Sequence, residues 1–120
     1  MDNSSVLTLE EAKTCFDQIN FGKQKHDPEF SSLYQEFLES AIQYSLIRAN
    51  WSIMTQEERR DQDATRTIFH NNFIAQCQII ERYMESMGLE TTWTDVLGKD
   101  RKRIGDFVCH IFALIGISQR

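Results

Sequence analysis

The sequence contains few of the residues that interrupt regular structure. It has one proline and five glycines in 120 residues, which is well below ordinary usage. Because tight turns depend on these two residue types, a chain so poor in them does not suit an architecture of many short strands. No alternating run of apolar residues is long enough for a strand, so the composition predicts long helices and no sheet.

The chain also lacks an excess of positive charge. Its 13 Lys and Arg residues are outnumbered by 18 Asp and Glu residues, which gives a formal net charge of −5. Binding to nucleic acid requires clustered cations that contact phosphates. We therefore expect no nucleic-acid partner.

Long apolar runs are missing as well. The N-terminus has no basic segment followed by an apolar one, so we expect no secretory signal. The longest apolar run, 104–117, contains Asp106 and His110, which makes it too short and too polar to span a bilayer. We expect no membrane partner and a cytoplasmic protein.

The three cysteines do not suggest a disulfide framework or a zinc site. Cys15, Cys77 and Cys109 are odd in number, widely spaced and without a C-x-x-C pattern. All three have apolar neighbours, so we interpret them as small buried residues in a reducing compartment. A reactive thiol is the alternative. Cys109 is the best candidate for it because it lies nearest the run of basic residues at 99–103.

Apolar residues recur at helical spacing along most of the chain. A Thr followed three residues later by Glu is a capping box, and this pattern begins the first and third helices. Asp27 caps the second helix before Pro28, while Gly22 follows the first and Gly88 the third. These signals predict helices over 8–20, 28–50, 55–87 and 100–117, with a short turn within 91–98.

We therefore predict an all-α fold, a four-helix, mostly antiparallel, bundle-like single domain over 1–120 with one short extra helical turn. We expect residues 1–7 to form a disordered N-terminus. The first turns of the third helix are polar, and the sequence leaves open whether that helix is broken near 61–63. Ile68 is expected to face the core, and Gly105 indicates a close approach by another helix.

A run of cations at 99–103 is the most unusual local feature. With Asp100 as N-cap, Arg101, Lys102 and Arg103 occupy the first turn of a helix, where the helix dipole disfavours positive charge. Either the helix starts earlier, or the side chains point into solvent or pair with nearby carboxylates. Alternatively, Arg101 and Arg103 bind an anion together with free backbone amides.

Two groups of polar residues interrupt the apolar patterns of the third and last helices. In one interpretation they hydrogen-bond between helices and fix the register. In the other they line a polar pocket between these helices that binds a small molecule or anion, with the candidate residues Arg66, His70, Asn71, Arg101, Arg103, Asp106 and His110. His70, Asp106 and His110 are weak candidates for metal ligands because no metal-binding motif is present. We assign no metal, no cofactor and no catalytic residue.

The C-terminal half resembles a family of small bacterial helical proteins of unknown function. The resemblance covers about 66–120 and is carried by Arg66, His70, Asn71, Phe73, Ile74, Arg82, Tyr83, Met84, Gly88, Trp93, Leu97, Gly98 and the run from Asp100 to Phe107. It implies a bacterial, intracellular, helical protein. It implies no activity and no assigned site.

The leading functional hypothesis is a helical protein-interaction or regulatory module without catalytic activity. The second and last helices carry more apolar surface than four short elements easily cover, and such surface is often covered by a partner protein or by a second copy in a homodimer. The alternative is a small-molecule or anion binder, or a metal-dependent protein, that uses the polar pocket between the third and last helices.

Overall fold

The described chain is built from helices. The computed structural model describes residues 7–23, 27–98 and 101–118, and this part of the chain contains no strand. The helices are α1 (Leu9–Lys23), α2 (Pro28–Trp51), α3 (Gln56–Ser86), α4 (Trp93–Leu97) and α5 (Arg101–Ser118). The predicted all-α fold of four helices and one short extra turn is therefore confirmed. None of the described helices is long and apolar enough to cross a lipid bilayer.

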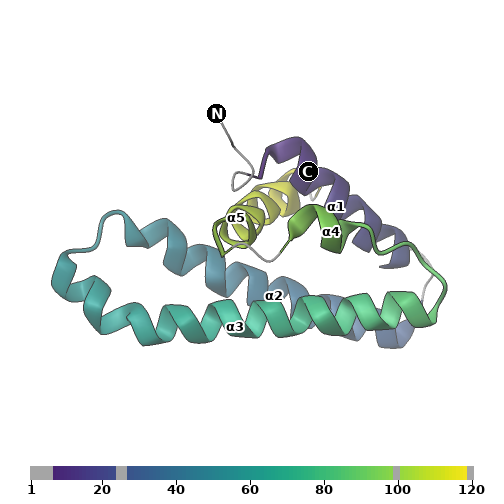
Figure 1. The fold of residues 1–120 in the computed structure, drawn as a ribbon, viewed down its shortest axis with the longest axis horizontal. Helices are drawn as coiled ribbons and strands as arrows, with labels where there is room; N and C mark the ends of the chain where they lie inside the picture. Colours follow the sequence, from purple (N-terminus) through teal and green to yellow (C-terminus); the bar gives the residue numbers. More distant parts are fainter. Residues whose placement is uncertain (1–6, 24–26, 99–100, 119–120) are drawn as a thin grey trace.

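A long antiparallel hairpin of α2 and α3 forms the base of the molecule (Figure 1). α5 crosses this hairpin and packs against α2, while α1 packs against both α4 and α5. The far end of the hairpin, where α2 is joined to α3, extends beyond the other helices (Figure 1). The hairpin is thus covered along only part of its length.

Local hydrogen bonds fix the starts of the two hairpin helices. The Asp27 carboxylate accepts from the backbone N–H groups of Glu29 at 2.9 Å and Phe30 at 3.3 Å. The Thr55 hydroxyl accepts from the N–H of Glu58 at 3.1 Å, and the Glu58 carboxylate accepts from the N–H of Thr55 at 2.9 Å. Both caps are confirmed, and each satisfies backbone donors that the first helical turn leaves unpaired.

The third helix is continuous over 31 residues, with no break near 61–63. At its end Gly88 has a φ of 72°, and its N–H donates to Glu85 O at 3.0 Å. The N–H of Leu89 donates to Met84 O at 2.9 Å. This pair of bonds forms a Schellman motif at the glycine expected to follow the third helix, and the positive φ explains why glycine occupies the position.

A row of aromatic rings joins three helices through the core. The ring centroids of Phe37 in α2 and Phe73 in α3 lie 5.4 Å apart, and those of Phe73 and Phe107 in α5 lie 6.1 Å apart. All three side chains are fully buried. Ring pairs at these separations stabilise beyond the effect of burial alone, so this row ties α5 to the hairpin.

Two expectations from the sequence differ from the structure. α1 continues through Gly22 to Lys23 instead of ending near Asn20, because one glycine costs a helix only about 1 kcal/mol and does not force a break. Ile68 does not face the core, since its side chain is 56% exposed. α3 packs mainly against α2, so the opposite side of α3 near the projecting end remains in solvent.

The core contact of Phe73 and the exposure of Ile68 predict contrasting effects on stability. Phe73→Ala should lower the free energy of unfolding by about 3–5 kcal/mol, because it leaves a cavity between two rings. Ile68→Ala should change it by less than about 0.5 kcal/mol. Urea unfolding followed by circular dichroism at 222 nm measures both. Similar losses in the two variants would contradict this placement of the α3 faces.

Candidate functional site

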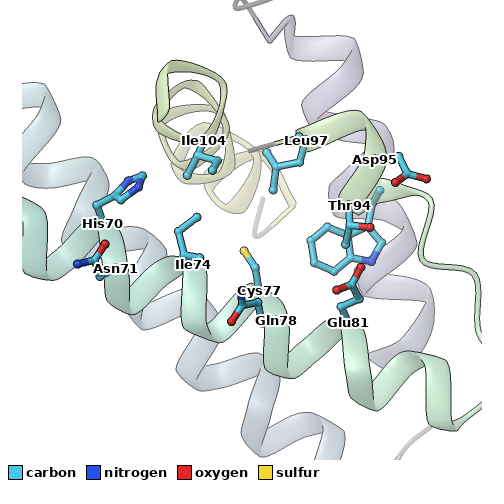
Figure 2. A pocket seen from close by; sticks show the side chains of 12 residues that line it. His70, Asn71, Ile74, Cys77, Gln78, Glu81, Thr94, Asp95, Leu97 and Ile104 are labelled. Carbon is cyan, nitrogen blue, oxygen red and sulfur yellow. The ribbon is translucent and has the colours of Figure 1, made fainter. Parts of the chain in front are cut away.

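A cleft of about 560 Å³ lies between α3 on one side and α4 and the start of α5 on the other (Figure 2). From α3 it is lined by His70, Asn71, Ile74, Cys77, Gln78 and Glu81. The opposite wall consists of Trp93, Thr94, Asp95, Leu97, Gly98 and Ile104. The cleft is therefore built from segments that are far apart in the sequence.

One side of α3 supplies its wall of the cleft. The lining residues recur at three- and four-residue intervals from His70 to Glu81, which places them along one helix face. The fully buried residues Phe73, Ile80 and Met84 follow the same spacing in a different phase and occupy another face. Because a helix rises 1.5 Å per residue, the wall from His70 to Glu81 is about 16 Å long.

The middle of the cleft is apolar. Ile74 and Cys77 of α3 lie opposite Ile104 and Leu97 (Figure 2). Leu97 and Ile104 are almost completely buried, while Ile74 is half-buried on the open side of its helix. This part of the cleft offers surface that an apolar side chain could cover.

The end of the cleft at His70 is fixed by a neighbouring tyrosine. The Nδ1 atom of His70 lies 3.0 Å from the hydroxyl oxygen of Tyr44 in α2, within hydrogen-bond distance. The two rings also meet edge to face, with centroids 5.3 Å apart. Tyr44 therefore orients the imidazole at this end, and Asn71 lies beside it (Figure 2).

The other end of the cleft carries negative charge. The carboxylate of Glu81 reaches from α3 toward Thr94 of α4, and Asp95 lies at the rim with its carboxylate turned outward (Figure 2). Glu81 is half-buried, and it has no hydrogen bond or ion pair within the described part of the chain. The described lining includes these two carboxylates and no Lys or Arg.

Contacts with α1 hold α4 in position. The backbone N–H of Trp93 donates to Gln18 Oε1 at 2.9 Å, and Gln18 Nε2 donates to the hydroxyl of Thr92 at 2.8 Å. The Cys15 thiol donates to Trp93 O at 3.5 Å. The Trp93 side chain is fully buried, and its Nε1 has no hydrogen-bond partner among the described residues.

Among the candidate residues from the sequence, His70 and Asn71 line the cleft. Arg66, one turn before His70, does not line it. Its guanidinium carbon lies 4.1 Å from the ring centroid of Trp51, and it forms an ion pair with Asp63 at 3.1 Å. Arg66 therefore belongs to the projecting end of the hairpin.

Arg103 joins α5 to two other segments. Its Nη2 lies 3.3 Å from Glu11 Oε2 of α1 and also donates to Val96 O, and its Nε donates to Leu97 O at 3.3 Å. The sequence leaves open whether the cations at 99–103 pair with nearby carboxylates or bind an anion. Arg103 pairs with a carboxylate, that of Glu11. The side chain of Arg101 and the proposed cap Asp100 lie outside the described residues.

Asp106 and His110 bind the backbone just before α1. The N–H of Leu7 donates to Asp106 Oδ2 at 3.2 Å, and His110 Nε2 donates to Leu7 O at 3.1 Å. Leu7 is only 1% exposed, although it belongs to the segment expected to be disordered. Asp106 and His110 explain why Leu7 is ordered and buried, because they satisfy both of its backbone hydrogen-bonding groups. Residues 1–6 lie outside the described part.

The three weak metal-ligand candidates do not form a common site. His70 lies in the cleft beside Tyr44, whereas Asp106 and His110 bind Leu7. Across the described ranges, no group of three or more His, Cys, Asp or Glu residues is arranged to hold a metal ion.

Arg48 is not among the candidate residues that the sequence indicates, yet it occupies a close contact with α5. A Cβ atom at Gly105 would lie 2.3 Å from its guanidinium carbon. The close approach expected at Gly105 is therefore made by a side chain of α2 rather than by a helix backbone. A larger residue there would require the guanidinium group, which is the end of a flexible side chain, to shift.

This contact predicts a coupling between two substitutions. Gly105→Ala should destabilise the native protein, because the new methyl group displaces Arg48. In an Arg48→Ala background the same change should stabilise by about 1 kcal/mol, the usual gain of alanine over glycine in a helix. A double-mutant cycle of urea unfolding measures the difference. Equal effects in both backgrounds would show that the two residues do not interact.

The cysteines differ in exposure, contrary to the expectation that all three are buried. Cys15 and Cys77 are buried, whereas Cys109 is exposed on α5. Burial raises the pKa of the Cys15 thiol to about 11. Burial raises the pKa of Cys77 further, and the nearby charge of Glu81 adds to that shift. Both buried thiols are therefore protonated near neutral pH and are poor nucleophiles.

Thiol modification checks this difference. At pH 8 the folded protein should react rapidly with Ellman's reagent at one thiol per chain, and at three in denaturant. Cys109→Ser should remove the rapid reaction, because the remaining thiols are buried and protonated. Rapid reaction of two or more thiols in the folded protein would be inconsistent with the burial of Cys15 and Cys77.

Comparison with known proteins reveals no relatives. No protein-family model, curated protein or solved structure gives a significant match to the chain. The resemblance of residues 66–120 to a bacterial family therefore remains an expectation from the sequence. Inferences about function rest on the cleft.

Proposed function

We propose that the protein is a helical interaction module without catalytic activity, and that its cleft holds a short apolar segment of a partner protein. The observation that carries this proposal is the apolar middle of the cleft with polar groups at both ends. Its volume of about 560 Å³ falls in the range of ligand-binding clefts. Covering Ile74 would remove exposed apolar surface from water, which favours binding.

The length of the cleft favours a segment of polypeptide. The wall from His70 to Glu81 is about 16 Å long, the length of about three helical turns or five extended residues. Such a segment could place successive apolar side chains along Ile74 and Cys77. Its polar backbone could face the open side of the cleft.

The arrangement of polar groups supports a role in binding rather than catalysis. His70 and Glu81 stand at opposite ends of the cleft, so they are too far apart to act together on one bond. Cys77 lies between them, but the raised pKa of its thiol keeps it protonated.

We also propose that the protein is cytoplasmic. A second copy of the chain, in a homodimer, is the other partner that we propose for such a module. The three cysteines are unpaired, and the exposed thiol of Cys109 suits a reducing compartment. The net charge of −5 supports a partner other than nucleic acid.

A small apolar molecule is the second candidate for the same cleft, favoured by the cleft's volume. An anion has less support, because Arg66 and Arg103 engage Asp63 and Glu11 away from the cleft. The carboxylate of Glu81 would also repel an anion bound at its end.

Selection from a peptide library tests the proposal. A phage-displayed library of random peptides of about twelve residues, selected on the immobilised protein, should yield peptides rich in apolar residues. Ile74→Glu should weaken their binding more than tenfold, because it places a charge in the apolar middle of the cleft. Ile68→Glu is the matched control on an exposed position of the same helix, and it should leave binding unchanged.

Two outcomes would contradict the proposal. Selected peptides that bind both variants equally would place the interaction outside the cleft. A native mass spectrum that shows the protein carrying a small molecule, lost in Ile74→Glu, would favour the second candidate instead. Circular dichroism of both variants establishes that each is folded.

A further inference from the structure

The two ends of the cleft differ in charge. At one end, the imidazole of His70 is already engaged by the hydroxyl of Tyr44. At the other end, Glu81 carries a carboxylate that has no hydrogen bond or ion pair with any described residue. A bound segment would therefore meet different chemistry at its two ends.

Occupation of the cleft would change the environment of Glu81. The side chain is already half-buried beside the apolar middle of the cleft. A segment lying over Ile74 and Cys77 would remove more water from its carboxylate, and an unpaired charge is unfavourable in such surroundings. An uncharged apolar segment would therefore bind against this penalty, whereas a cation at this end would offset it.

The neighbouring cation of α3 does not supply that charge. Arg82 follows Glu81 in the sequence, but its exposed side chain turns back along the helix, where Nε donates to Gln78 O at 3.4 Å. It forms no ion pair with a described carboxylate. Among the described residues, no Lys or Arg lines the cleft beside Glu81 and Thr94, so a partner could supply a cation there.

The opposite wall contains one buried donor without an acceptor in the described part of the chain. Trp93 lines the cleft, and its buried Nε1–H has no hydrogen-bond partner among the described residues. Buried donors are rarely left unpaired. Because this side chain is fully buried, a bound segment would not reach Nε1 directly, but the indole lies in the wall and its environment would change when the cleft is occupied.

We infer that the partner segment carries a Lys or Arg beside its apolar residues and places this cation next to Glu81. The inference rests on the proposed function. It adds the charge of the partner segment and the end of the cleft at which its charged residue lies. The basic residue lies at the α4 end of the cleft, and the apolar residues extend from there toward His70.

The two tryptophans of the chain provide a direct test by nuclear magnetic resonance. Each has one indole N–H signal, so Trp93 reports on the cleft and Trp51, at the projecting end of the hairpin, is the internal control. The probes are the capped peptide Ala-Leu-Ala-Leu-Lys and the same peptide with norleucine in place of lysine. Each is titrated into the ¹⁵N-labelled protein.

Both peptides should shift the Trp93 indole signal and leave the Trp51 signal in place. The lysine peptide should bind about two- to fivefold more tightly, which is the range for a partly exposed ion pair. Glu81→Gln should remove this preference, and the norleucine peptide should bind somewhat more tightly to this variant because its binding no longer desolvates an unpaired charge. Glu85→Gln is the matched control, since it removes the same charge from an exposed position one turn further along α3, and it should retain the preference.

The outcomes separate the two proposals. Equal binding of both peptides, or a preference for lysine that survives Glu81→Gln, would overturn the assignment of the cation to Glu81 and leave the proposed function standing. Absence of any shift at Trp93 with either peptide would count against the cleft as a peptide site, and the inference would fall with it.

Discussion

The contact of Phe73 with Phe37 and Phe107 is the interaction on which the rest of the structure depends. It is the place where both helices of the hairpin meet α5, so it anchors α5 where that helix crosses the hairpin. Since α3 packs mainly against α2, a second face of α3 remains uncovered. The cleft is the space between that face and the elements that α5 helps to position.

The second wall of the cleft depends on contacts that are distant in the sequence. α4 has only five residues, and helices this short are unstable alone. Buried Trp93, its backbone bond to Gln18 and the bonds from Arg103 to the carbonyls of Val96 and Leu97 hold it in place. Of the two alternatives that the sequence leaves open for Arg103, carboxylate pairing and anion binding, the structure shows pairing with Glu11, and the same side chain helps to hold α4 in place.

The sequence predicts the features that depend on neighbouring residues. The Thr55 cap and the Gly88 motif are recognisable because their partners lie within a few residues. Helical periodicity indicates which residues share a face but not which helix covers that face. For this reason the prediction that Ile68 faces the core is wrong. His70 is identified as a cleft residue, whereas Glu81 and Thr94 become neighbours only when α4 folds against α1.

The central claim is that α2, α3 and α5 form a stable frame that presents a preformed cleft. Hydrogen exchange of backbone amides in the free protein tests it most directly, because exchange reports local opening. We expect slow exchange in α2, in residues 70–84 of α3 and in residues 104–111 of α5, with faster exchange in the uncovered turns at 56–64. Exchange in residues 70–84 as fast as that in residues 56–64 would show that the α3 wall of the cleft is not stably formed, and would contradict the claim.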